Sequence, residues 1–127
     1  MEQIITAASI LFGFLFAGFW WALDRELKFP PEERHFKLAY GLILATMILI
    51  AVFGVLIPLR SMTEDTPSLR TPVAGIAAGL AGVFGYMLTE LAHYGIYRRP
   101  IYYGRYEWFF FLITIIAMAV LFIWALQ

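Results

Sequence analysis

The chain alternates between long apolar stretches and short polar connections. The apolar stretches cover residues 4–23, 36–59, 72–97 and 108–126. The hydrocarbon core of a bilayer is about 30 Å thick and takes about 20 residues of α-helix to cross. Each stretch has about that length, and none has a lysine or arginine in its middle. The pattern therefore predicts four transmembrane helices.

Transmembrane β-strands do not fit this pattern. A closed β-barrel is the other structure that can span a bilayer, but its strands alternate apolar and polar residues. The apolar stretches here are continuous. We therefore expect an all-α polytopic membrane protein, in which residues 1–127 form a single domain. Its four helices are expected to form an up-down bundle of two hairpins.

Small residues recur at helical spacing in two of the predicted helices. Such spacing lets two helix backbones approach each other closely in a membrane. The residues are Ser9, Gly13 and Ala17 in the first helix and Gly75, Gly79 and Gly82 in the third. We expect both sets to pack against a neighbouring helix, from this chain or from a partner subunit.

The glycine-bearing face of the third helix becomes polar further along. Tyr86, Glu90, His93 and Tyr97 continue the steps of three and four residues, so they share that face. A charged side chain facing lipid is costly, so Glu90 must face protein. We expect these four residues to line a small polar pocket for a quinone, haem or pigment shared with partner subunits. The structural alternative is that Glu90 and His93 satisfy each other, since residues three apart on a helix can meet, or that they reach up to Arg98 and Arg99.

A second Glu-x-x-His motif begins at Glu32. Paired Glu-x-x-His motifs supply ligands in di-iron carboxylate bundles. The candidate metal ligands are therefore Glu32, His35, Glu90 and His93, and the two histidines alone are a candidate haem pair. Depth opposes both sites, because His35 and His93 differ by roughly 6–9 Å along the helix axes, whereas metal–nitrogen bonds are about 2 Å long. In the simpler interpretation Glu32 lies in the first turn of a helix that begins near Pro31.

Composition narrows the class of protein. The chain is 62% hydrophobic with a mean hydropathy of +0.79, and 14% of its residues are charged, against about 25% in soluble domains. Net charge is zero, which excludes a nucleic-acid partner that reads phosphates through a basic patch. The chain has no cysteine, which excludes disulfides, thiol catalysis and thiolate metal sites. The expected partners are the lipid bilayer and other membrane subunits.

Lysine and arginine are distributed unevenly among the connections. Two of the nine, Arg60 and Arg70, lie in the second connection. The other seven lie in the first and third: Arg25, Lys28, Arg34, Lys37, Arg98, Arg99 and Arg105. Basic loops stay on the cytoplasmic side, so both termini are expected on the non-cytoplasmic side. The expected location is a bacterial or archaeal cytoplasmic membrane, or an organelle inner membrane.

Three functions remain open. We expect a small non-catalytic subunit of an energy-transducing, electron-transfer membrane complex, which supplies packing surface and part of a cofactor or quinone pocket. The first alternative is a homo-oligomeric, proton-coupled transporter or channel, which needs polar groups near mid-membrane. The first, second and fourth helices offer only Thr6, Ser9, Thr46 and Thr114. The second alternative is a membrane redox protein with a metal or haem at the paired Glu-x-x-His motifs.

Overall fold

Four long helices make up the protein in a computed structural model that describes residues 1–34, 37–62, 68–96 and 104–127. The helical spans are Glu2–Leu27, Leu38–Ser61, Arg70–Ile96 and Arg105–Leu126, each long and apolar enough to cross a membrane. The described part of the chain contains no strand. The predicted all-α, multi-pass architecture is therefore confirmed at the level of four helices that could span a membrane.

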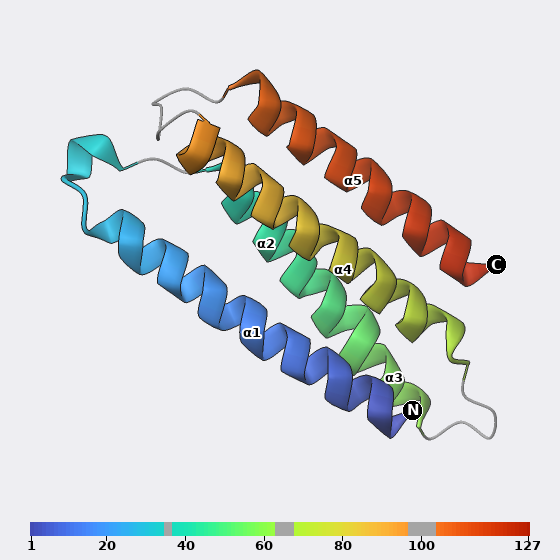
Figure 1. Ribbon diagram of the computed structural model, residues 1–127. Helices are drawn as coiled ribbons and strands as arrows, with labels where there is room; N and C mark the ends of the chain where they lie inside the picture. Colours follow the sequence, from blue (N-terminus) through green and yellow to red (C-terminus); the bar gives the residue numbers. More distant parts are fainter. Residues whose placement is uncertain (35–36, 63–67, 97–103) are drawn as a thin grey trace.

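Two of the four spans are subdivided by a change in helix type (Figure 1). The first and fourth spans are α1 (Glu2–Leu27) and α5 (Arg105–Leu126). The second consists of α2 (Leu38–Leu49), the π-helix η2 (Ile50–Leu56) and α3 (Ile57–Ser61). The third consists of α4 (Arg70–Leu91) and the π-helix η3 (Ala92–Ile96), and a 3₁₀ turn, η1 (Pro31–Glu33), follows α1.

Pro58 lies inside the second span without ending it. A proline has no N–H, and its ring clashes with the carbonyl four residues earlier in an α-helix. The π-helix η2 lies directly before Pro58, and the N–H of Ile57 reaches back five residues to the carbonyl of Val52. This wider turn accommodates the ring, so the helix continues to Ser61.

The second helix begins later than the sequence pattern predicts. Pro31 does start a turn, but η1 has only three residues, and Arg34 after it is extended, with φ −79° and ψ 134°. The Arg34 guanidinium donates to the carbonyls of Leu27 and Phe29, both at 2.7 Å, and so caps the end of α1. The helix itself starts at Leu38. The helix does not continue from Pro31, because Arg34 is extended and its side chain binds the end of α1.

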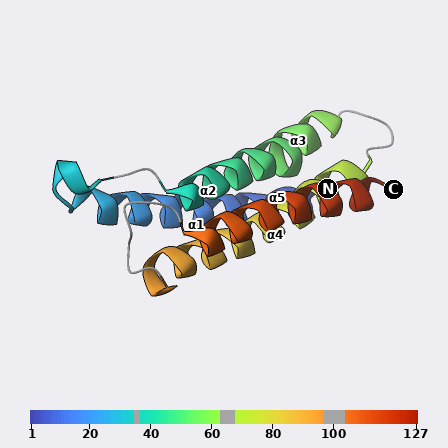
Figure 2. The same ribbon diagram turned by 90° about the horizontal axis from the view of Figure 1, so that it is seen from above.

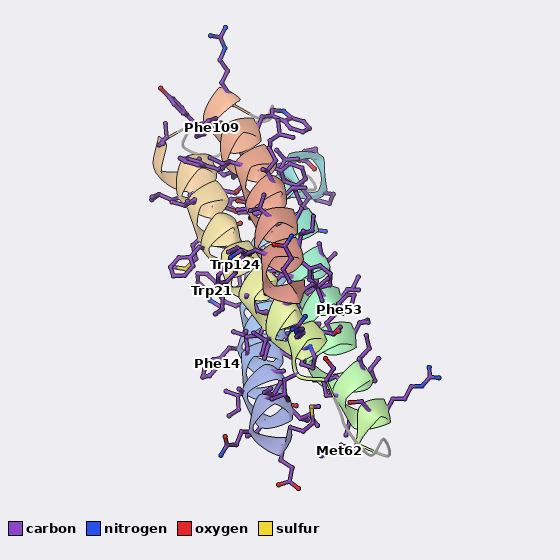
Figure 3. The ribbon with its side chains drawn as sticks, turned by 90° about the vertical axis from the view of Figure 1, so that its right-hand side faces the viewer. Phe14, Trp21, Phe53, Met62, Phe109 and Trp124 are labelled. Carbon is purple, nitrogen blue, oxygen red and sulfur yellow. The ribbon has the colours of Figure 1, made fainter. Side chains whose placement is uncertain are left out.

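Helices α2 and α4 form the centre of the bundle, and α1 and α5 flank them (Figures 1 and 2). The outer helix α1 packs mainly on α2 and η2, and α5 packs mainly on α4. In the apolar part of each span, 39% of the residues are buried in the central spans and 11% in the outer ones. Large side chains such as Phe14, which is 75% exposed, project away from the bundle (Figure 3). This surface faces lipid or other protein.

Glycines let α4 approach both of its neighbours. A Cβ atom on any of three glycines would collide with a side chain of the second span. These pairs are Gly75 with Phe53, Gly79 with Ile50, and Gly82 with Thr46. On the other side of α4, a Cβ on Gly85 would collide with Thr114 of α5. The closest helix contacts of the bundle therefore depend on missing side chains along α4.

The small residues of the first helix face outward instead. Ser9, Gly13 and Ala17 are exposed, and nothing lies within 4 Å of the position that a Cβ on Gly13 would take. Helix α1 approaches η2 through Ala8 and Gly54, where a Cβ on the glycine would lie 2.7 Å from the Ala8 methyl group. The expected packing of the Ser9 face thus does not occur within the described chain, and only a partner subunit remains as its predicted neighbour.

Candidate functional site

Ionisable side chains from all four spans gather at one end of the bundle, where α1 and η3 end and α2 and α5 begin. We call one group of these the ionic cluster: Arg25, Glu26, Lys37, Glu90 and Tyr94. Beside it lies the pair of His93 and Glu107. Ionisable groups inside membrane-spanning helices are rare and face protein or water, so this end is the candidate site.

Glu90 is at the centre of the ionic cluster. Its carboxylate accepts hydrogen bonds from Arg25, with Nη2 2.6 Å from Oε2, and from Lys37, with Nζ 3.2 Å from Oε1. The fully buried Lys37 also donates to the Tyr94 hydroxyl at 2.6 Å, and its Nζ lies 4.0 Å from the carboxylate of Glu26. Two cations therefore face two carboxylates, which offsets part of the cost of burying the charges.

Aromatic rings cover the two cations. The Tyr94 ring centroid is 4.0 Å from the guanidinium carbon of Arg25 and 4.4 Å from the ammonium of Lys37. Trp21 lies 4.9 Å from the same guanidinium, and Tyr40 lies 4.5 Å from the ammonium. Each cation–π contact is worth about 0.5–2 kcal/mol, depending on its desolvation. The rings thus cover part of each cation while they stabilise it.

His93 pairs with a carboxylate on another helix. Its Nδ1 lies 2.7 Å from Oε1 of Glu107, and both side chains are fully buried. The other oxygen of Glu107 accepts the backbone N–H of Gly104 at 3.1 Å and so caps α5. Positions three apart on a helix differ by about 60° in direction. Glu90 therefore reaches α1 and α2, while His93 reaches α5.

The residues of the predicted metal site do not form an assembled ligand set in the described structure. Glu32 is exposed on η1. Glu90 and His93 bind their partners in two different contacts, and His35 lies outside the described residues. Among the residues that the structure describes, no three histidine, aspartate or glutamate side chains come together as a metal site.

Two of the four residues of the predicted cofactor pocket, Glu90 and His93, contact other side chains of the chain. Tyr86 is partly buried against the apolar core. Tyr97 lies outside the described residues. An apolar groove of about 430 Å³ lies instead between η2 and α5, and one of about 250 Å³ lies between α1 and the second span. Of the polar groups that we expected to face a cofactor, Glu90 therefore binds Arg25 and Lys37, and His93 binds Glu107.

Sequence reasoning missed the partners of Glu90. Its two cations are 65 and 53 residues away along the chain, so helical spacing says nothing about them. A usable signal existed, because a carboxylate inside a span requires a cation at a similar depth. Arg25 closely follows the first apolar stretch, and Lys37 lies at the start of the second. These are the cations that the bundle brings to Glu90.

No family model, no curated protein and no solved structure matches this chain. Its function is therefore inferred from the arrangement of its own residues. Two features carry that inference: buried charged side chains that gather at one end of the bundle, and an apolar, glycine-packed contact along the rest of it.

Proposed function

We propose that the chain is a small, non-catalytic integral membrane subunit of a larger membrane assembly, to which it supplies packing surface. One observation carries this proposal. The buried acidic and basic side chains of the described residues lie at one end and bind other side chains there. The remaining length of the contact between α4 and the second span is closed by glycines of α4 against Thr46, Ile50 and Phe53. A transport path needs polar groups at mid-membrane, and this contact offers little beyond one hydroxyl.

The outer helices supply the packing surface. Only 11% of the apolar part of α1 and of α5 is buried within the chain. On α1, the exposed Ser9, Gly13 and Ala17 follow the small-residue spacing at which membrane helices associate. A helix of a partner subunit is our proposed neighbour for this face.

The proposal includes an orientation and a class of assembly. The chain crosses the bilayer four times, up and down, with both termini outside and the ionic cluster at the cytoplasmic or matrix side, where the basic loops stay. The class is an energy-transducing, electron-transfer complex. A quinone or haem of a partner would come closest to this chain near Tyr86 and Glu90.

Capture of the full-length chain from native membranes tests the proposal. The tagged protein is extracted in mild detergent, and the bound proteins are identified by mass spectrometry and by an absorption spectrum. We expect foreign membrane proteins in stoichiometric amounts, with the bands of a redox cofactor. A clean homodimer or homotetramer would overturn the proposal.

Two glycine variants test whether the captured proteins bind through the face of Ser9, Gly13 and Ala17. Gly13 and Gly18 both lie on α1, and neither has an atom within 4 Å of its Cβ position, so a side chain can begin at both positions without a clash. Gly13→Leu places its side chain on the face of Ser9 and Ala17, whereas Gly18→Leu lies outside it. We expect Gly13→Leu to lose the partners and Gly18→Leu to retain them.

A homo-oligomeric, proton-coupled transporter is the second candidate. It is favoured by the complete burial of Lys37 among carboxylates, since buried membrane charges are costly and mark functional sites. Proton flux into proteoliposomes that contain only this chain, abolished by Glu90→Gln, would establish this candidate instead. Bound iron or a Soret band in the purified chain alone would favour the metal or haem alternative.

A further inference from the structure

The groove between η2 and α5 is lined by apolar side chains only. Its residues are Leu49, Phe53, Ile115, Met118, Ala119, Phe122 and Ile123, and its volume is about 430 Å³. We propose that it is a binding site for one acyl chain of a bilayer phospholipid, from the leaflet at the end of the bundle where α5 ends.

The groove arises from the way α5 is held. Glycine contacts such as Gly85 with Thr114 fix α5 on α4, whereas α2 makes few contacts with α5. The π-helix η2 carries Phe53, whose ring meets that of Phe122 of α5 edge-on at a centroid distance of 4.8 Å. The two helices therefore touch at this ring pair and leave an open channel beside it.

The size of the groove fits one hydrocarbon chain. A dry cavity of about 150 Å³ holds one benzene, so a groove of this volume holds roughly 17 carbon atoms. Along α5 its lining runs from Ile115 to Ile123, a rise of about 12 Å, which is close to the roughly 15 Å depth of one leaflet. An acyl chain of ordinary length therefore matches both the volume of the groove and its length along α5.

Other occupants fit less well. A 12 Å length of helix about 10 Å across fills roughly 900 Å³, about twice the volume of the groove, so a partner helix would lie over the groove rather than in it. An isoprenoid quinone tail would fit by chemistry. Its head needs hydrogen-bonding groups, however, and the ionic cluster around Glu90 lies at the other end of the bundle.

A pair of neighbouring substitutions on α5 tests the proposal in the full-length protein. Ala119→Phe fills the groove, whereas Val120→Phe adds bulk at a position that is 58% exposed outside it. After exhaustive detergent exchange, we expect mass spectrometry to find about one phospholipid per chain in the wild type and in Val120→Phe, and at least a fivefold loss in Ala119→Phe. Added dioleoylphosphatidylcholine should raise the Tm of the first two proteins but not of the third.

A second groove variant provides the same test in case the first variant does not fold. Ile123→Trp narrows the groove near the end of α5 and should show the same loss, so it decides the matter if Ala119→Phe does not fold. Equal phospholipid retention in all variants would overturn the proposal. Recovery of a quinone or a partner protein in place of phospholipid, lost in Ala119→Phe, would overturn it as well.

Discussion

Glu90 is the residue on which the ionic cluster depends. Its two oxygens engage cations from α1 and from the start of α2, and its side chain is only 14% exposed. Lys37 is fully buried, and removal of this carboxylate leaves Arg25 and Lys37 with Glu26 as the remaining carboxylate of the cluster. Breaking a buried ion pair by deleting one partner typically costs about 3–5 kcal/mol, because the remaining charge is left uncompensated. A substitution of Glu90 should therefore weaken the contact of α4 with α1 and with the start of α2.

We predict that Glu90→Ala lowers the free energy of unfolding by about 3–5 kcal/mol. The measurement is a denaturant titration in mixed micelles, followed by circular dichroism. Asp24→Ala is the matched control. It also removes a carboxylate from an ion pair, but this pair, Asp24 with Lys28 at 2.8 Å, is exposed and lies within one segment at the end of α1. Exposed pairs are worth about 0–1 kcal/mol. Equal losses in the two variants would contradict a buried ionic junction.

The His93–Glu107 pair gives a second prediction at this scale. Glu107→Ala removes both the contact with His93 and the acceptor for the Gly104 N–H, whereas Glu107→Gln retains an oxygen for one of them. We expect the Tm to fall further in Glu107→Ala than in Glu107→Gln. Thermal unfolding in detergent measures this order, and the reverse order would mean that Glu107 does not cap α5.

At the residue scale, the sequence identified the face but not the partners. Helical spacing put Glu90 and His93 on one side of the third span, and both side chains do face protein. Spacing along one helix carries no information about which neighbour approaches from which side. That depends on how α1, α2 and α5 pack, so spacing alone could not assign Arg25, Lys37 and Glu107, although depth in the span pointed to the two cations.

At the element scale, the length of the apolar stretches predicted the four helices, whereas the turn residues did not predict where the second helix begins. Continuous hydrophobic stretches predicted all four spans, because lipid forces the backbone hydrogen bonds inside each helix. The start of the second helix was missed, since Arg34 caps α1 in an extended conformation. Pro58 does not end the second span, because the π-helix η2 before it accommodates the proline ring. Helix ends depend on contacts that hydropathy does not record.

Some glycines lie in close helix contacts and others face open space, so alanine substitutions at the two kinds of position should differ in their effect on stability. Gly85→Ala places a methyl group against Thr114 of α5 and should cost about 1–3 kcal/mol by overpacking. Gly13→Ala enters open space and should be neutral or slightly stabilising, because alanine is the better helix former. Paired denaturant titrations measure the difference. Similar effects at the two positions would contradict the close α4–α5 contact.

At the scale of the whole molecule, the buried charged side chains of the described residues gather at one end of the bundle. The ionic cluster and the His93–Glu107 pair lie at the end that also bears the basic connections, and the opposite end carries the two termini and the second connection. Positive-inside sorting during insertion acts on such asymmetry. The buried cluster then fixes the same arrangement from within, because Arg25 and Lys37 can meet Glu90 only when the first two spans lie beside the third.

The absence of cysteine makes this orientation directly testable. We predict that Ser68→Cys, exposed just before α4, reacts with a membrane-impermeant maleimide in intact cells. Glu32→Cys, exposed on η1 in a basic connection, should react only after the membrane is permeabilised. The wild-type chain provides a background of zero, since it has no thiol. The opposite labelling would place the ionic cluster at the outer surface, and a partner subunit, rather than loop charge, would then have to set the orientation.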